Sequence, residues 1–194
     1  MRTMRMFRTL GVVAGSVVLT AALSSCGDDS DGDAKRTTSV SVAQSSAVAQ
    51  QFADACKILT PEQISAATGR QTQPGELSTA TNLEPGETRC TWNAADGKRV
   101  LLATLYTQPM DAREKFEALR TGLFYDEDAP SPGVGEESFY RLAGHGDLAS
   151  IVFIDGGSTV HLRLGNPDDT PASTEREAEG REQLVELARD VTSR

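Results

Sequence analysis

Residues 148–164 read LASIVFIDGGSTVHLRL and carry the clearest folding signal in the chain. Two runs rich in apolar residues, 148–154 and 158–164, flank the turn residues Asp155-Gly156-Gly157. Consecutive glycines adopt the positive φ angles of a tight turn without steric cost, and β-branched residues on both sides favour strands. The stretch therefore predicts an antiparallel hairpin.

The same kind of pattern recurs earlier in the chain. A strand is expected to open at Cys90-Thr91-Trp92-Asn93, to turn at Asp96-Gly97 and to return over residues 99–106. Residues 137–142 predict a further strand. Residues 70–88 are rich in Pro, Gly, Thr and Glu and predict a long loop.

Helix signals surround these strands. Thr60 is placed as an N-cap, Pro61 as the first helical residue and Gln63 as the capping-box partner, and Gly69 supplies a stop, so a helix is expected over residues 61–68.

Two more segments have helical spacing, 111–120 with Asp111 as N-cap and the amphipathic 175–191. Together, these strands and helices predict one α+β domain over residues 51–194, with a mostly antiparallel sheet and helices packed on one face.

The N-terminus predicts export. Arg2, Arg5 and Arg8 precede a charge-free, mostly apolar stretch over residues 10–23. That stretch has the length of a signal-peptide core and is short of the ~20 residues that span a bilayer. Residues 1–25 are therefore interpreted as a signal peptide, and no transmembrane helix is expected after it.

The signal peptide ends in Leu23-Ser24-Ser25-Cys26, which resembles a bacterial lipobox. The resemblance implies diacylglycerol transfer to the Cys26 thiol, cleavage before Cys26, and acylation of the new amino terminus by a chain such as palmitate. The chain would then sit on the extracytoplasmic face of the cell membrane, held by its lipid, with residues 26–50 as a flexible linker. An ordinary secretory signal is the alternative.

The net charge and the number of cysteines further limit the kinds of partner and site that the protein can have. Residues 1–25 hold three arginines and no acid, so the remaining 169 residues carry a formal charge of −12, which argues against a nucleic-acid partner. Outside the cytosol, Cys56 and Cys90 are expected to form a disulfide. A metal site or a redox pair is the weaker alternative, because no further ligand or Cys-x-x-Cys accompanies them.

Three motifs in order resemble a family of actinobacterial cell-envelope lipoproteins of unknown function. They are Cys56-Lys57-Ile58-Leu59-Thr60-Pro61-Glu62, then Cys90-Thr91-Trp92, then Gly133-Val134-Gly135-Glu136-Glu137, spread over residues 54–191. Glu136 stands where Asp is more usual. The resemblance implies a disulfide-clamped α+β domain akin to PsbP-like or sensor-kinase extracellular domains, and it implies no catalytic residues.

Candidate sites for chemistry are weak. His145 and His161 lack a third ligand for zinc, and a surface or packing role is favoured for both. Gly156-Gly157-Ser158 is interpreted as a turn rather than a nucleophile elbow, and Gly133-Val134-Gly135 does not match a nucleotide loop.

Acidic and aromatic residues add two further candidates. Asp126, Glu127 and Asp128 could serve acid–base or calcium chemistry, although a solvated loop is favoured. Trp92 and Phe139 could line a ligand groove, although core packing beside the disulfide is favoured.

The resulting hypothesis is a membrane-anchored, non-catalytic binding or sensing domain at the cell envelope. Its expected partners are the membrane, through the lipid, and an unidentified envelope protein or small or lipidic ligand. No catalytic residue, metal or cofactor is predicted. The rival class is an envelope hydrolase or another enzyme acting on cell-wall or lipid substrates. A cleft with convergent carboxylates, such as Asp126 or Glu136 facing His145, would favour this class.

Overall fold

The structure is a computed structural model, and it describes residues 54–107, 111–122, 125–144, 146–168 and 170–194. The predicted signal peptide, Cys26 and the predicted linker lie outside the described residues, as does His145.

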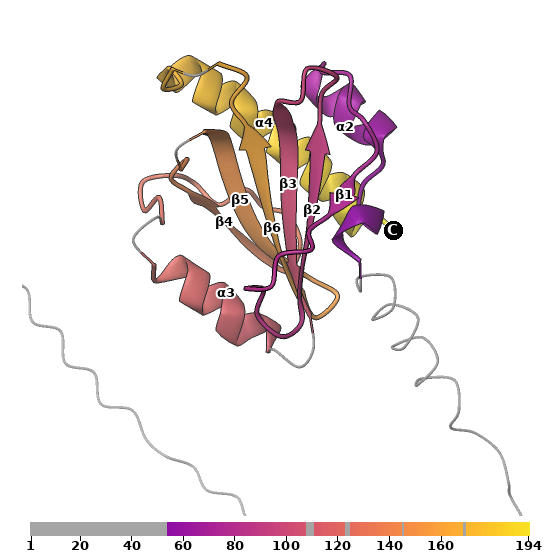
Figure 1. Cartoon of the computed structure of the whole chain (residues 1–194). Helices are drawn as coiled ribbons and strands as arrows, with labels where there is room; N and C mark the ends of the chain where they lie inside the picture. The colour runs from indigo at the N-terminus through magenta and orange to yellow at the C-terminus, as the bar shows by residue number, and fades with distance from the viewer. Residues whose placement is uncertain (1–53, 108–110, 123–124, 145, 169) are drawn as a thin grey trace, which may run out of the picture. The chain divides into compact units, whose positions relative to one another are not determined.

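A six-stranded sheet forms the centre of the domain, and every neighbouring pair of strands is antiparallel (Figure 1). The strand order is β1-β2-β3-β6-β5-β4. The strands are β1 Glu76–Leu77, β2 Glu87–Asn93, β3 Arg99–Tyr106, β4 Glu137–Arg141, β5 Asp147–Asp155 and β6 Ser158–Gly165.

The predicted hairpin is confirmed as β5–β6, two of the three longest strands. Asp155 pairs with Ser158 across the turn, and Gly156 and Gly157 have φ angles of 55° and 77°. The hairpin β2–β3 is confirmed as well. The expected long loop over residues 70–88 instead contains β1 and the start of β2, because a two-residue edge strand is too short to show a hydrophobic period.

The two helices for which caps were predicted begin after those caps, at Pro61 and Ala112. The helices are the 3-10 helix η1 Ala55–Lys57 and the α-helices α2 Pro61–Thr68, α3 Ala112–Arg120 and α4 Thr174–Thr192. The capping box of α2 is reciprocal: Thr60 Oγ1 accepts from the Gln63 amide, and Gln63 Oε1 accepts from the Thr60 amide at 2.9 Å. Asp111 caps α3 by accepting from the Glu114 amide at 2.9 Å.

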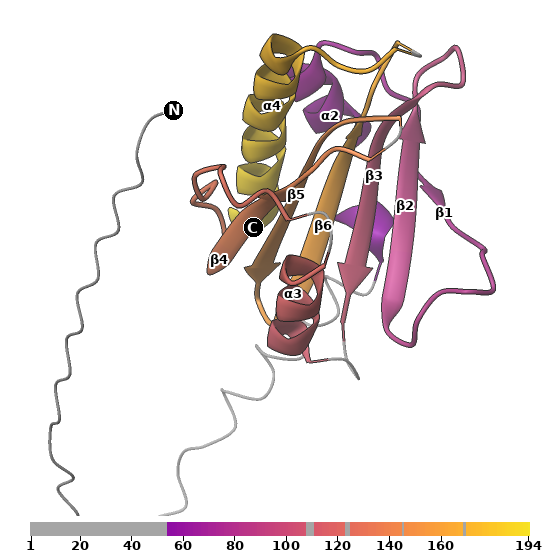
Figure 2. The ribbon, with the colours of Figure 1, turned by 90° about the vertical axis from the view of Figure 1, so that its left-hand side faces the viewer.

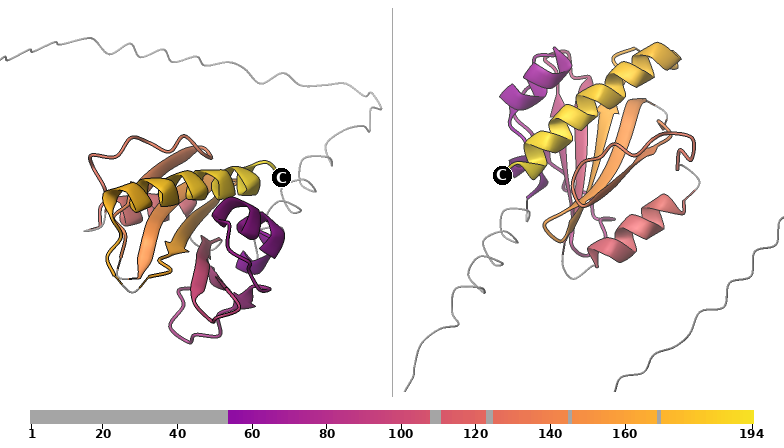
Figure 3. Two further views of the ribbon diagram at one scale, coloured as in Figure 1. Left: turned by 90° about the horizontal axis from the view of Figure 1, so that it is seen from above. Right: turned by 180° about the vertical axis from the view of Figure 1, so that it is seen from behind.

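Helices α2 and α4 cover one face of the sheet, and α4 runs diagonally across it (Figure 3). The main core lies between them. Its side chains include Leu184 and Leu187 from α4 and Ile151 and Phe153 from β5, all fully buried. This layer matches the expectation of helices packed on one face.

Helix α3 is the exception, because it packs against the opposite face (Figure 2). Phe116 of α3 forms a second apolar cluster with Phe139, Val152 and Ile154, whose strand positions alternate with those of the main core. The Phe116 and Phe139 rings meet edge to face at 4.9 Å. Sequence spacing shows that 112–120 is amphipathic but not which face of the sheet it covers, so the expected single helical layer is too simple.

A disulfide between Cys56 and Cys90 fastens η1 to the inner strand β2, with the two Cα atoms 5.0 Å apart. Cys90 and Trp92 are both fully buried, so the core position predicted for Trp92 is confirmed. Gly75 passes so close to this pair that a Cβ on it would lie 2.5 Å from Cys90 Sγ. The disulfide closes a 34-residue separation and contributes about 3–4 kcal/mol in the chain-entropy model.

Candidate functional site

The sheet face that carries α3, called here the α3 face, is apolar at one end and polar beyond it. In antiparallel sheets, residues directly opposite one another share a face. One cross-strand row on this face consists of Arg141, Ser150, Arg163 and Leu102, and the next consists of Phe139, Val152, His161 and Thr104. Phe139 and Val152 lie under α3, whereas Arg141, Ser150 and Arg163 lie outside its apolar cluster.

Two β-bulges add further charge to this polar region. The registers Trp92↔Leu101 and Asn93↔Arg99 leave Val100 as an extra residue in β3. Val100 and Leu101 are therefore both buried in the main core. The alternation of side chains between the two sheet faces shifts by one residue at this bulge, and Arg99 consequently lies on the α3 face.

The second bulge has the same effect in β5, where Leu148 is the extra residue and both Leu148 and Ala149 join the main core. Gly180 of α4 accommodates them closely, since a Cβ there would lie 2.8 Å from Leu148 Cγ. Asp147 is thereby turned away from α4 and toward Arg163. Bulges of this kind re-aim side chains next to functional sites.

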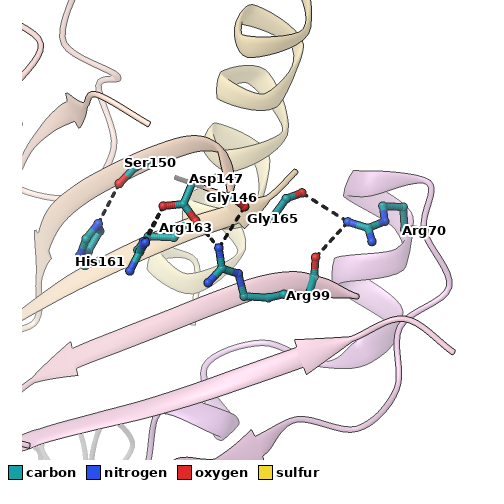
Figure 4. Close-up of polar contacts among 8 residues, drawn as sticks. All are labelled: Arg70, Arg99, Gly146, Asp147, Ser150, His161, Arg163 and Gly165. Atoms are coloured by element: carbon teal, nitrogen blue, oxygen red, sulfur yellow. Dashed lines mark hydrogen bonds and ion pairs between the residues drawn. The ribbon is translucent and has the colours of Figure 1, made fainter. Parts of the chain in front are cut away.

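Asp147 anchors two arginines although its own side chain is only 1% exposed (Figure 4). Its Oδ2 accepts from Nε of Arg163 at 2.9 Å and from Nη2 at 2.6 Å, and its Oδ1 accepts from Nη2 of Arg99. A buried carboxylate with two cationic partners keeps a surplus of positive charge around it. The ion pairs also fix the directions of both guanidinium groups.

The strand ends that carry these groups are held in place by Arg70, which lies just after the end of α2. Arg70 donates from Nη1 to the carbonyl oxygens of Arg99, at 3.2 Å, and of Gly165, at 3.4 Å (Figure 4). Gly165 is required there, because a Cβ would lie 2.1 Å from the Arg99 carbonyl oxygen. The arginine positions therefore depend on backbone packing between β3 and β6.

Ser150 and His161 form a buried pair beside the ion pairs. Ser150 Oγ lies 2.8 Å from His161 Nε2, and the residues are 4% and 6% exposed. Burial is the main cause that lowers the pKa of His161 to about 3, and the positive charges of Arg141, Arg163 and Arg89 account for the rest of this shift. His161 is therefore a neutral imidazole at neutral pH.

A pocket of about 200 Å³ opens over these residues, and we call it the arginine pocket. It is lined by Arg141, Leu142, Gly144, Asp147, Ser150, His161 and Arg163. The lining residues carry two positive charges and one negative charge, and Arg99 adds a third positive charge through Asp147. Arg141 and Arg163 line the same pocket, and burial lowers the pKa of Arg141.

The arrangement offers hydrogen-bond donors to a small negatively charged group. Guanidinium groups match the geometry of carboxylate and phosphate oxygens, and the Ser150 hydroxyl can add a third donor. A metal cation is disfavoured by the positive charge. Among the described residues, no group of three or more His, Cys, Asp or Glu side chains is arranged to hold a metal ion.

The other candidate residues lie in the core, in a turn and in an ion pair. His161 packs in the sheet as favoured, and Gly156-Gly157-Ser158 is a turn. Asp126 is paired with Arg181 of α4 at 2.5 Å rather than free in a loop. Phe139 is buried as favoured, but it packs with Phe116 and Tyr125 in the second cluster, away from the disulfide.

Sequence reasoning missed the arginine pocket itself. His161 and Arg163 are two residues apart on one strand, so they share a face, and that face reads as polar in an otherwise apolar hairpin. That alternation was the available signal. No sequence signal places Asp147 and Arg99 on the α3 face, because their placement depends on the two β-bulges.

Within the described residues, no helix has the length and apolar character needed to cross a membrane. Comparisons with protein-family models, with curated proteins and with solved structures find no match to this chain.

The pKa of His161 predicts an acid-sensitive fold. Below pH 6.5 the unfolded chain protonates this histidine while the folded chain does not until about pH 3, so stability falls as the pH drops through that window. The expected loss between pH 7 and pH 5 is about 2 kcal/mol. Urea unfolding of the wild type and of His161→Gln at both pH values measures it. Equal pH dependence in the two proteins would contradict the prediction.

Proposed function

We propose that this chain is a lipid-anchored binding or sensing protein on the extracytoplasmic face of the cell membrane, with the arginine pocket as its ligand site. It would belong with the envelope lipoproteins of unknown function that it resembles. The lipobox at Cys26 supports the anchor, and the disulfide between Cys56 and Cys90 is in keeping with an oxidising compartment.

The observation that carries the binding proposal is the polar end of the α3 face. Burying polar and charged groups is costly unless they are paired, and a folding core alone does not require them. Here Asp147, Ser150 and His161 are all nearly buried in a sheet whose opposite face is apolar throughout its centre. Their arrangement around a pocket supports a role in binding rather than in packing.

The rival class, an envelope hydrolase, has one observation in its favour, the 2.8 Å contact between Ser150 and His161. A serine beside a histidine can act as nucleophile and base. Here the histidine would have to become a cation among three arginines. Its pKa of about 3 makes that step costlier by about 5 kcal/mol than for an ordinary histidine, which favours binding over hydrolysis.

The anchor is tested by Cys26→Ser. Without the thiol, no lipid can be attached, and we expect the chain to leave the membrane fraction of the producing cell. Ser25→Ala keeps a small residue in the lipobox and is the matched control, which should stay in the membrane. Retention of Cys26→Ser in the membrane after removal of the signal peptide would show that the anchor is wrong.

The binding role is tested by adding an envelope extract to the ¹⁵N-labelled full chain carrying Cys26→Ser. We expect concentration-dependent NMR shifts centred on the amides of Ser150, His161 and Arg163, with the bound compound recovered chemically unchanged. The control is Ser193→Ala, at the exposed end of α4, which should bind as the parent does.

Two outcomes contradict the binding role. One is a spectrum that the extract leaves unchanged at the pocket. The other is conversion of the bound compound in a manner lost in Ser150→Ala and retained in Ser193→Ala, which would establish the hydrolase instead.

A further inference from the structure

The charge of the arginine pocket runs against the charge of the whole protein. The chain has 28 acidic and 19 basic residues, so its surface repels anions on average. In the pocket lining, two arginines face a single carboxylate, Asp147, and that carboxylate is already bound by Arg163 and Arg99. A concentration of positive charge on an acidic protein selects for a negatively charged ligand.

The positions of Arg141, Ser150 and Arg163 across the strands limit the size of the ligand group to a single compact one. Ser150 lies between Arg141 and Arg163, because it pairs with Arg141 across β4–β5 and with Arg163 across β5–β6. Neighbouring strands are about 4.8 Å apart, so the two arginines arise from positions about 10 Å apart, and their long side chains can converge above Ser150. A pocket of about 200 Å³ holds one such group and little more.

Asp147 prepares Arg163 for this role. It accepts hydrogen bonds from Nε and Nη2, and in the described residues Arg163 makes no other hydrogen bond, so Nη1 keeps its donors. The Gly144 backbone lies close over the same pair, since a Cβ there would be 3.2 Å from Asp147 Oδ2 and 3.6 Å from Arg163 Nη2. The guanidinium is thus fixed in direction before a ligand arrives, which lowers the entropic cost of binding.

Ser150 and His161 complete the set of donors. A neutral histidine that donates from Nε2 to Ser150 Oγ leaves the hydroxyl proton of Ser150 free to point at a ligand. The arginines around His161 favour this neutral form. The buried pair is then explained as a support for one directed donor.

We propose that the arginine pocket binds one oxyanion group, a phosphate or carboxylate, between Arg141 and Arg163, with the Ser150 hydroxyl as a third donor. This rests on the proposed function and specifies its ligand class. The group can belong to a soluble compound or to a lipid headgroup in the membrane beside which the domain would be anchored.

The test titrates the full chain carrying Cys26→Ser, with its disulfide intact, with inorganic phosphate, with acetate, and with phosphatidylcholine vesicles that contain phosphatidic acid. The readout is the NMR signals of the Ser150, His161 and Arg163 amides and of the Arg163 Nε–H group. We expect saturable shifts with phosphate or acetate. Additional shifts with the vesicles identify a lipid headgroup as the source, and their absence identifies a soluble compound.

Arg141→Gln should weaken the binding of phosphate or acetate about tenfold, because one charge-assisted donor is lost. The matched control is Arg113→Gln, which removes the same charge from an exposed ion pair with Glu137 and should change the affinity less than about twofold. Ser150→Ala should weaken binding severalfold with no change in net charge, and it covers the case in which Arg141→Gln does not fold.

Two results would overturn the proposal. The first is a lack of saturable shifts at the pocket with both phosphate and acetate, and the second is an equal loss of affinity in Arg141→Gln and Arg113→Gln, which marks a nonspecific charge effect. If an envelope extract still shifts the pocket amides while both anions fail, the ligand class is wrong and the binding function stands. If phosphate and acetate bind but the envelope extract does not shift the pocket amides, the proposed binding function is wrong, although the pocket does bind an oxyanion.

Discussion

The alternation of side chains along the hairpin β5–β6, from Ala149 to Leu164, is the constraint on which the rest of the structure depends. Because successive residues point to opposite faces, one set of positions, including Ile151, Phe153 and Leu162, builds the main core under α2 and α4. The alternate set must then build the other face. It does so with an apolar end under α3 and a polar end around His161 and Arg163.

Much of the fold was predictable because its signals are local. Turn glycines and capping residues act within four positions of one another, so the hairpin at Gly156-Gly157 and the helix that starts after Thr60 follow from the sequence alone. The side on which α3 packs and the pairing of β1 depend on contacts distant in sequence. No local pattern contains that information, and these two features were therefore wrong or absent in the prediction.

The candidate site was less predictable for a related reason. His161 was visible as a histidine on a strand, but its meaning depends on Ser150 and on arginines from other strands. Asp147 reaches the site through a one-residue bulge, which inverts the face that simple alternation assigns to it. The pocket matches no catalytic or metal-binding sequence pattern, because its arginines, serine and histidine are common residues that come together only across neighbouring strands.

The proposal that an anion binds between Arg141 and Arg163 requires His161 to be a buried neutral imidazole among these arginines. An NMR titration of the His161 ring signals measures its protonation state. We expect the ring of the ligand-free chain to stay neutral from pH 7 to well below pH 5, with a pKa near 3, and saturating phosphate to raise this pKa by offsetting the charge of Arg141 and Arg163. A ring that titrates near pH 6.5, with a pKa unchanged by phosphate, would be the opposite result.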